Sequence, residues 1–506
     1  MKVLRRGHFR LITILSVAGL VLLYMYYHTA GGDHGSPAGD EEAVDSSSAA
    51  GAALSSSKQR VRQVAYPLQS AGSSSNQHAE DVRLAVAGQK TPHDQCPLIS
   101  APVTDVNTVT QFPKFDFLPA WMRGREFWDS NFEKRYLKRR AKWRKLPLKV
   151  FLMPHSHNDP GWLKTFEEYY FHQTSKILHN MIDKLTLHSN MTFVWAEVSF
   201  LALWYERAHP SLRQRLKELV HEGRLEILTG GWVMPDEAST HLYALIDQMV
   251  IGHQWLNRTI GIKPVNGWSI DPFGHGAAVP YLLQESSITG TVIQRIHYAW
   301  KQWLAEQQLG DFKWRQTWDA EGDADILVHN RPFDIYSIKH SCGPHLQICL
   351  EYDFRKIPGE YTEYSIKSVP IDENNVKLKA ELLLDQYGRQ GSLVPHNVVL
   401  VPIGDDFRYD HASEWGQQYT NYQMLLEHIN KNPTRYHASI HWGTVKDYFK
   451  EVRSRMKEFP TLQGDFFVYS DIFTEGRPAY WSGYYTTRPY WKLLERQLQA
   501  VLRSAE

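Results

Sequence analysis

A histidine and an aspartate stand two positions apart, shortly after a short apolar run. The run covers residues 149–153, and His157 and Asp159 follow it. On an extended segment, residues i and i+2 point to the same side, so this imidazole and this carboxylate can reach one metal ion. Zinc accepts both kinds of ligand. The same spacing also fits a capped surface loop, so the pair alone indicates only a candidate metal site.

Three further aspartates follow other apolar runs. Asp271 comes directly after residues 267–270 and precedes a proline, so it fits a metal ligand, a nucleophile or a helix N-cap. Asp405 and Asp406 follow residues 398–402. One of them would act as a general acid whose pKa is raised by burial and a neighbouring charge, although a solvated turn fits the spacing equally well. A nucleophilic and an acidic carboxylate on different strands are the pair that a retaining glycosidase uses.

Aromatic side chains are frequent, with 17 Trp, 26 Tyr and 21 Phe. Sugar-binding clefts use the flat faces of such rings, but hydrophobic cores use them too. The candidates for sugar contacts are Trp162, Phe273, Tyr336 and Trp481. Each of them, taken singly, fits a core position as well as a sugar contact.

Short apolar runs alternate with helical stretches from about residue 148 onward. This alternation predicts parallel strands joined by crossover helices. Because active sites of such folds lie at the carboxyl ends of the strands, the polar residues after each run are expected to share one site. The predicted strands are 149–153, 193–197, 225–228, 267–270, 291–294, 326–329 and 398–402, and the predicted helices include 169–187, 210–222 and 242–256.

The overall composition of the chain excludes few classes of function. Hydrophobic residues make up 42% of the 506 residues, enough for a sizeable core, and the net charge of +1 gives no indication of a nucleic-acid partner. Cys342 and Cys349 lie close together, whereas Cys96 stands alone. This arrangement fits an oxidising compartment with the partner of Cys96 missing, and three buried thiols are the alternative.

The N-terminal sequence predicts a membrane anchor followed by a stem. Residues 1–10 form a basic cytoplasmic tail, and residues 11–27 are an uncharged, largely apolar run at the short end for a membrane span. A cleavable signal peptide is the competing interpretation. Residues 28–95 are rich in Ser, Ala, Gly and Gln and predict a flexible luminal stem.

Five sequence strings together resemble the signature of glycoside hydrolase family 38, in particular its Golgi α-mannosidase II branch. The resemblance covers roughly residues 96–506. The strings are PHSHNDPGWLKT at 154–165, TGGWVMPDE at 229–237, IDPFGH at 270–275, GDDFR at 404–408 and YWSGYY at 480–485.

The resemblance implies a role for each candidate side chain. It implies one zinc ion held by His157, Asp159 and Asp271, with Asp271 also the nucleophile. Asp406 would be the general acid/base, with Asp405 beside it. The residues implied to line the mannose site are Trp162, Phe273, Arg295, Tyr336 and Trp481.

The resemblance also implies the fold and the setting. Residues 96–485 would form a seven-stranded parallel α/β barrel, and residues 486–506 would begin a helical domain. The enzyme would remove α-1,3- and α-1,6-linked mannose from N-glycans on the luminal side of the Golgi membrane. The resemblance leaves open whether the chain forms a homodimer. Cys342 and Cys349 match a family disulfide, and Asn190 and Asn257 begin glycosylation sequons.

Three departures from the family leave other functions open. The family's fourth zinc ligand lies in a His-His-Asp string that does not occur in this sequence, and the family's GlcNAc-holding Cys-Pro-Trp string is replaced by Tyr364, Ser365 and Ile366. Ser337 also replaces an aspartate that follows the binding tyrosine. The alternatives are a truncated, inactive glycan-binding or regulatory form, and a metal-dependent hydrolase of other chemistry, such as a deacetylase.

Overall fold

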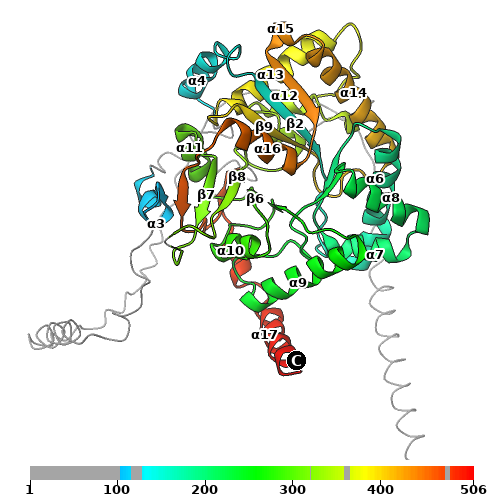
Figure 1. The fold of residues 1–506 in the computed structure, drawn as a ribbon, viewed down its shortest axis with the longest axis vertical. Helices are drawn as coiled ribbons and strands as arrows, with labels where there is room; N and C mark the ends of the chain where they lie inside the picture. Colours follow the sequence, from blue (N-terminus) through cyan, green and yellow to red (C-terminus); the bar gives the residue numbers. More distant parts are fainter. Residues whose placement is uncertain (1–102, 116–127, 320, 358–364, 473–478, 506) are drawn as a thin grey trace, which may run out of the picture. The chain divides into compact units, whose positions relative to one another are not determined.

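The computed structural model describes residues 103–115, 128–319, 321–357, 365–472 and 479–505. All of them belong to the second of two compact units of the chain, residues 90–506. They form a mixed α/β fold in which strands alternate with helices along most of the sequence (Figure 1).

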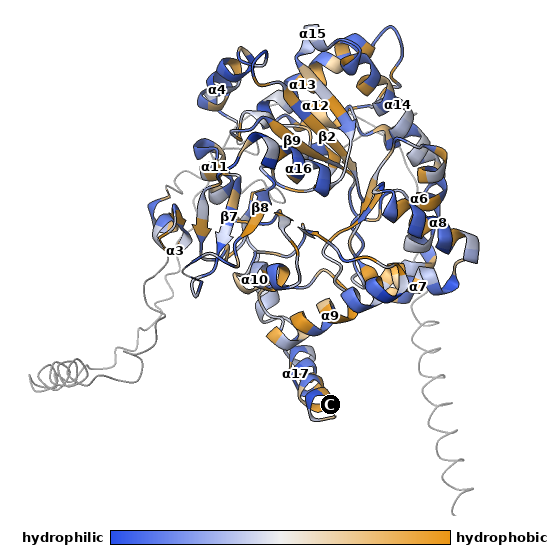
Figure 2. Cartoon of the chain, in the orientation of Figure 1, coloured by the Kyte–Doolittle hydropathy of each residue, from blue (hydrophilic) through white to orange (hydrophobic). Residues whose placement is uncertain are grey.

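A three-stranded parallel sheet carries the first polar motif. Strand β2 (Leu148–Pro154) lies between β9 (Val398–Ile403) and β10 (Ala438–Trp442). All of β9 and nearly all of β2 are buried, as expected for parallel strands covered on both faces. Figure 2 shows these two strands mainly in orange, the colour of hydrophobic residues.

A six-stranded sheet carries the second group of motifs. Its pairings are parallel except for β7 against β8, which are antiparallel. The strands, in spatial order, are β1 (Val106–Asn107), β11 (Thr461–Gln463), β7 (Asp311–Arg315), β8 (Ile326–Asn330), β6 (Gly290–Ile293) and β5 (Asn266–Ser269).

A pair of strands connects these two sheets. Strands β3 (Phe193–Trp195) and β4 (Leu225–Ile227) pair in parallel with each other. His155, just after β2, bridges Val194 of β3, and Thr229, just after β4, donates its backbone N–H to Asn266 of β5. Among the described residues, the hydrogen bonds between strands therefore define separate sheets. They do not define the single closed ring of strands that a seven-stranded barrel requires.

All seven predicted strands are present, with bounds within two residues of the expected ones. Strands β7, β10 and β11 were not predicted, because short segments such as Asp311–Arg315 and Ala438–Trp442 mix polar and apolar residues and lack the continuous apolar run used as the signal.

The predicted helix over 169–187 is present but interrupted. A short α5 (Phe166–Tyr169) begins at a Thr165 capping box, continues as a π-helical turn (Tyr170–Thr174) and becomes α6 (Ser175–Leu187). A π-helical turn inside a helix often marks a functional site. Here it shifts the α6 residues relative to the start of the helix.

The other two predicted helices match closely. Helix α8 (Pro210–His221) begins with a proline at its first position and a His209 cap, and α9 (Leu242–Thr259) begins after His241. Further helices cover the sheets. They are α4 (Ser130–Arg140), α7 (Val198–Arg207), α10 (Ala278–Glu285), α11 (Tyr298–Gln307), α13 (Val376–Gly391), α14 (Ala412–Asn430) and α16 (Val445–Arg455).

The predicted anchor, residues 11–27, the stem and Cys96 all lie outside the described residues. Within the described part of the chain, no helix is long and apolar enough to cross a membrane. A C-terminal helix, α17 (Pro489–Ala505), is present where residues 486–506 were expected to become helical.

The Cys342–Cys349 disulfide implied by the family resemblance is present in the structure. It joins Cys342, two residues after the 3-10 turn Ile338–His340, to Cys349 of the short helix α12 (Leu346–Leu350), and this region follows Tyr336 in the chain. Both cysteines are buried in the main hydrophobic core.

Candidate active site

His157, Asp159 and Asp271 come together in one cluster, as the sequence predicted. Their potential ligand atoms all lie within 4.8 Å of one another. His157 Nε2 is 3.2 Å from Asp159 Oδ1 and 3.4 Å from Asp271 Oδ2. His157 and Asp159 follow β2, and Asp271 follows β5, so the cluster joins the ends of strands from two different sheets.

This donor set fits a zinc ion. Ligand atoms about 2.0–2.2 Å from a tetrahedral ion lie roughly 3.3–3.5 Å from one another, close to the two distances above. One imidazole nitrogen and two carboxylate oxygens are also donor types that zinc accepts. His157 is nearly fully buried, which limits its exchange with water.

Asp271 is held from its other side by Arg295. Arg295 Nε donates to Asp271 Oδ1 over 2.6 Å, while the second oxygen, Oδ2, faces His157. Burial alone would raise the pKa of Asp271, but the charge of Arg295 and the contact with His157 lower it to about 2. Asp271 is therefore a carboxylate at any physiological pH, with its two oxygens directed to different partners.

Aromatic rings surround the guanidinium group of Arg295. It lies 4.9 Å from the Trp481 ring, 5.3 Å from Phe273, 5.7 Å from Tyr469 and 5.9 Å from Tyr336. Phe273 and Trp481 are also in edge-to-face contact at 4.8 Å. Three of the four predicted aromatic candidates thus meet around one charged group next to Asp271, an arrangement that fixes Arg295 through cation–π contacts.

Asp406 lies beside the metal cluster through backbone pairing. His157 and Asp406 form an isolated parallel bridge, and the Phe407 N–H donates to the His157 carbonyl oxygen over 2.8 Å. Gly404 permits this approach, because a Cβ atom there would meet the carbonyl oxygen of His155 at 1.9 Å.

The protonation of the aspartate pair suits a general acid. Burial raises the pKa of Asp406, although a 2.6 Å hydrogen bond from the Tyr336 hydroxyl opposes the rise. Burial and the charge of Asp406 raise the pKa of Asp405 to about 6. One of these two carboxyl groups can therefore carry a proton at a pH where Asp271 is ionised.

Trp162 is placed differently from the other aromatic candidates. It is 66% exposed in the loop after Asp159, and it makes no ring contact with the other aromatic side chains of the described residues. Trp162 does not line the pocket of about 210 Å³ that contains the metal cluster. That pocket is lined by His157, Asn158, Asp159, Pro160, Met234, Pro235, Asp236, Asp271, Pro272, Phe273 and Tyr484.

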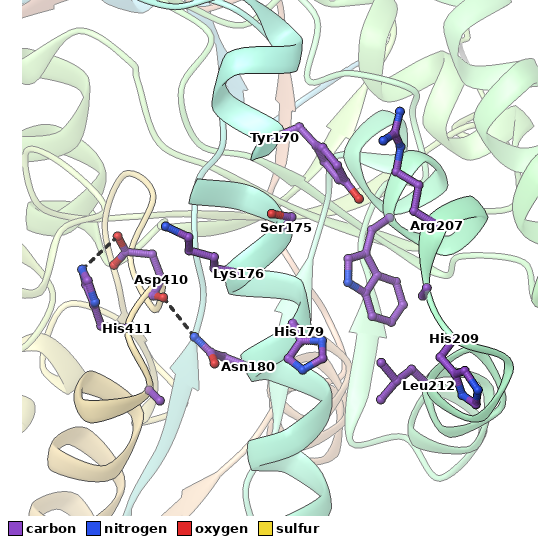
Figure 3. A pocket seen from close by; sticks show the side chains of 13 residues that line it. Tyr170, Ser175, Lys176, His179, Asn180, Arg207, His209, Leu212, Asp410 and His411 are labelled. Carbon is purple, nitrogen blue, oxygen red and sulfur yellow. Dashed lines mark hydrogen bonds and ion pairs between the residues drawn. The ribbon is translucent and has the colours of Figure 1, made fainter. Parts of the chain in front are cut away.

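A larger pocket of about 680 Å³ lies elsewhere, along helix α6. Figure 3 shows its side chains leaving α6 in opposite directions: Lys176 extends toward Asp410, and His179 extends toward Leu212. None of the predicted site residues lines it. Since the candidate metal ligands line the smaller pocket and none of them lines this one, we place the candidate active site in the smaller pocket.

Sequence reasoning assigned no role to two residues that the structure places here. Glu197 is buried, with Oε1 3.5 Å from His157 Nδ1, and the Tyr469 hydroxyl accepts a hydrogen bond from Arg295 over 3.2 Å. Glu197 ends a predicted strand, the same signal that identified Asp271 and Asp406. Tyr469 carries no comparable signal, because it lies in a segment without a predicted element.

Both predicted glycosylation residues are exposed. Asn257 lies near the end of α9. The Asn190 side chain is hydrogen-bonded to Gln423 and Tyr419, and the Thr192 hydroxyl of its sequon donates to a backbone carbonyl.

The family model for the glycosyl hydrolases family 38 N-terminal domain matches residues 147–472. The match includes the three cluster residues and both members of the Asp405–Asp406 pair. The chain therefore belongs to glycoside hydrolase family 38, and the resemblance noted in the sequence is confirmed.

The sequence is also similar to curated relatives. It is 56% identical over 418 residues to alpha-mannosidase 2 of Spodoptera frugiperda. The aligned region covers 83% of this chain and 37% of that protein. It is 42% identical over 389 residues to human alpha-mannosidase 2. That aligned region covers 75% of this chain and 33% of the human protein. The chain thus spans about a third of the length of these relatives.

Among solved structures, an alpha-mannosidase from Enterococcus faecalis V583 is similar at 15% identity with a TM-score of 0.46. The match covers 63% of this chain and 31% of that one.

Proposed function

We propose that this chain is the catalytic part of a zinc-dependent retaining α-mannosidase acting on N-glycans. The observation that carries the proposal is the position of Asp271, between a candidate metal cluster on one side and Arg295 on the other. The similarity to proteins named alpha-mannosidase 2 supports mannose as the sugar.

The side chains of this site have separate roles in the proposed reaction. Asp271, ionised and held by Arg295, attacks the anomeric carbon and forms a covalent glycosyl-enzyme. Asp406 gives its proton to the departing glycosidic oxygen, and it then accepts a proton from the water that releases mannose. The faces of Trp162, Phe273 and Trp481 provide the apolar contacts that sugar rings need.

The metal would be held by His157, Asp159 and Asp271. When bound, zinc supplies a Lewis acid that grips sugar hydroxyl oxygens near the reacting carbon. The described residues supply three ligands, which leaves room for oxygen atoms of the substrate in the coordination sphere.

The test is zinc content measured together with hydrolysis of a p-nitrophenyl α-mannoside by the full chain, purified in detergent. We expect about one zinc per chain, turnover that chelation abolishes and zinc restores, and retention of the anomeric configuration by NMR. Zinc bound without any mannoside hydrolysis would overturn the proposal.

The same assay separates the two alternative functions. Release of acetate from acetylated sugars in place of mannose would favour a deacetylase-like hydrolase. Binding of a mannose-rich glycan without turnover would favour a glycan-binding form.

We also propose that the enzyme works in the Golgi lumen, anchored by residues 11–27. Support for the anchor comes from the basic residues before this apolar run. Carbonate extraction of cell membranes tests the anchor, since an anchored chain stays in the pellet and a peripheral one is released.

A further inference from the structure

A buried glutamate, Glu237, is hydrogen-bonded on both sides of the segment that carries Asp271. Its side chain is only 2% exposed. Its Oε1 accepts from the Ser269 hydroxyl over 2.8 Å and lies 3.1 Å from Nδ1 of His275, and its Oε2 accepts from the Gly276 backbone N–H over 2.9 Å. Ser269 ends β5 before Asp271, whereas His275 and Gly276 follow it. One side chain thus ties together the two flanks of Asp271.

Other groups hold the middle of this loop, residues 270–276. The Tyr484 hydroxyl donates to the Phe273 carbonyl oxygen over 2.7 Å. The Gly274 N–H donates to the backbone carbonyl oxygen of Arg295 over 3.1 Å. The middle of the loop therefore has its own contacts, and its two ends depend on the glutamate.

The contacts of Glu237 are difficult to replace, because a carboxylate can only accept and here meets donors on both oxygens. His275 is fully buried, and the Gly276 N–H is fixed in the backbone. Without the carboxylate, these donors lose their acceptor, which is costly for buried polar groups. The loop can recover hydrogen bonds only if its ends move toward water.

The backbone that carries Glu237 is fixed without its carboxylate. Asp236 Oδ1 accepts from the backbone N–H groups of Ala238 and Ser239 over 2.7 and 3.1 Å. The Ser239 carbonyl oxygen accepts from Arg496 of α17 over 2.7 Å. Substitution of the Glu237 side chain therefore leaves this segment its own hydrogen bonds.

We propose that Glu237 is a positioning residue that holds both ends of the loop 270–276 and thereby fixes the direction of the Asp271 carboxylate. The proposal rests on the function proposed above, in which Asp271 is the nucleophile. Within the described part of the chain, Glu237 makes no hydrogen bond or ion pair with the three residues of the metal cluster, so it acts only through the loop.

Glu226 offers a matched control at the other end of the same strand. It lies on β4, and its carboxylate accepts from the side chain of Asn266, the first residue of β5, over 2.7 Å. It also accepts from the Lys446 backbone N–H over 3.0 Å. Glu226 is therefore a carboxylate that is hydrogen-bonded to β5 as Glu237 is, but away from the Asp271 loop.

The first measurement needs no metal. Hydrogen exchange of peptides covering residues 270–276 is followed by mass spectrometry in the metal-free full chain, for the wild type, Glu237→Leu and Glu226→Leu. Leucine has a similar size and no acceptor. We expect exchange to be about 10-fold faster in Glu237→Leu and unchanged in Glu226→Leu. Equal exchange in all three proteins, or an equal increase in both variants, would overturn the proposal.

The second measurement separates positioning from a general loss of stability. Hydrolysis of a p-nitrophenyl α-mannoside at saturating zinc gives kcat and KM for the same three proteins. We expect kcat to fall about 100-fold in Glu237→Leu, with KM within about 3-fold of the wild-type value, because a displaced nucleophile affects the reaction more than binding. Glu226→Leu should keep the wild-type kcat. A higher KM with unchanged kcat in Glu237→Leu would reject the positioning role.

The two measurements separate this proposal from the proposed function. If the wild type hydrolyses no mannoside, the proposed function fails, while hydrogen exchange still decides whether Glu237 holds the loop. If Glu237→Leu does not fold, Glu237→Gln takes its place. Its amide has one acceptor oxygen where the carboxylate has two, so we expect faster loop exchange and a lower kcat than in the wild type. Wild-type values of both in Glu237→Gln would overturn the proposal.

Discussion

At the scale of single residues, the candidate site contains two aspartates whose pKa values are shifted in opposite directions. Arg295 and His157 keep Asp271 ionised, whereas burial raises the pKa of Asp406. Both residues are aspartates after apolar strands, so their difference comes from their neighbours.

Replacing Asp271, the proposed nucleophile, should abolish turnover. In Asp271→Asn, the amide cannot attack the anomeric carbon, and we expect kcat to fall by about 10⁴-fold or more. The matched control is Asp325→Asn, because Asp325 is paired with Arg315 over 2.8–3.0 Å outside the site. Mannoside hydrolysis by Asp271→Asn at more than a hundredth of the wild-type rate would contradict the assignment.

Removing the hydroxyl of Tyr336 should shift the pH profile. Its hydrogen bond stabilises ionised Asp406, so its loss in Tyr336→Phe raises the pKa of Asp406 further. The general acid is active while protonated, so activity is lost as the pH rises through this pKa. We expect the alkaline limb of kcat/KM to move up by roughly one pH unit.

The control for this experiment is Tyr352→Phe. The Tyr352 hydroxyl is hydrogen-bonded to the Lys379 carbonyl oxygen and has no contact with the aspartate pair. An alkaline limb that stays in place in Tyr336→Phe, or that moves to lower pH, would contradict the role of this hydrogen bond.

At the scale of elements, the π-helical turn Tyr170–Thr174 contacts the loop of residues 155–159, which carries the candidate ligands His157 and Asp159. The Thr174 hydroxyl donates to Asn158 Oδ1 over 2.8 Å, and Asn158 in turn donates to Ser156 over 3.0 Å. Asn158 stands between His157 and Asp159, so this chain of hydrogen bonds holds the backbone that carries both predicted ligands.

Loss of the Thr174 hydroxyl should loosen the loop of residues 155–159. Thr174→Val keeps the shape but leaves the buried Asn158 oxygen without its donor, at a cost of about 1–2 kcal/mol in the free energy of unfolding. We expect zinc affinity to fall about 10-fold. Chemical denaturation and chelator competition measure the two effects.

Thr186→Val is the control for this turn, because Thr186 is exposed on the same helix and bonds only to its own helix and to Arg215. If Thr174→Val and Thr186→Val bind zinc equally well, the π-helical turn does not support the site.

At the scale of the whole molecule, a buried network joins the six-stranded sheet to β9. Asp311 of β7 accepts from the Tyr448 hydroxyl of α16 over 2.9 Å and lies 3.1 Å from both His329 of β8 and His396, just before β9. Asp311 is only 2% exposed. Four elements thus share one buried carboxylate.

This carboxylate should contribute to stability in a pH-dependent way. Burial alone would raise the pKa of Asp311, but His329 and His396 lower it below its usual range. A carboxylate with a lowered folded-state pKa contributes stability above its unfolded pKa of about 4, and this contribution is lost as the pH falls.

We therefore expect Asp311→Asn to lower the free energy of unfolding by about 3 kcal/mol at pH 7, and by less below pH 4. Urea denaturation at both pH values measures the difference. Asp323→Asn, at an exposed position, should change stability by less than about 0.5 kcal/mol. A difference that grows as the pH falls would contradict the ionised state of Asp311.

Local sequence signals predicted most of the elements and the candidate ligands. The runs that became β2 and β9 are mostly apolar because these strands are buried on both faces, so their ends could be located. His157 and Asp159 follow the end of β2, and Asp271 follows the shorter and more polar strand β5. Because the carboxyl ends of parallel strands share one edge, their convergence could be expected from the sequence.

The partners of those residues could not be predicted in the same way. Arg295 meets Asp271, Glu197 meets His157 and Tyr336 meets Asp406 across 24, 40 and 70 positions of sequence respectively. These contacts depend on which strand ends the fold brings together, and no local pattern in the sequence signals that. Local spacing specifies where strands end, but only tertiary packing decides which strand ends lie opposite one another. This packing also sets the protonation states on which the proposed chemistry depends.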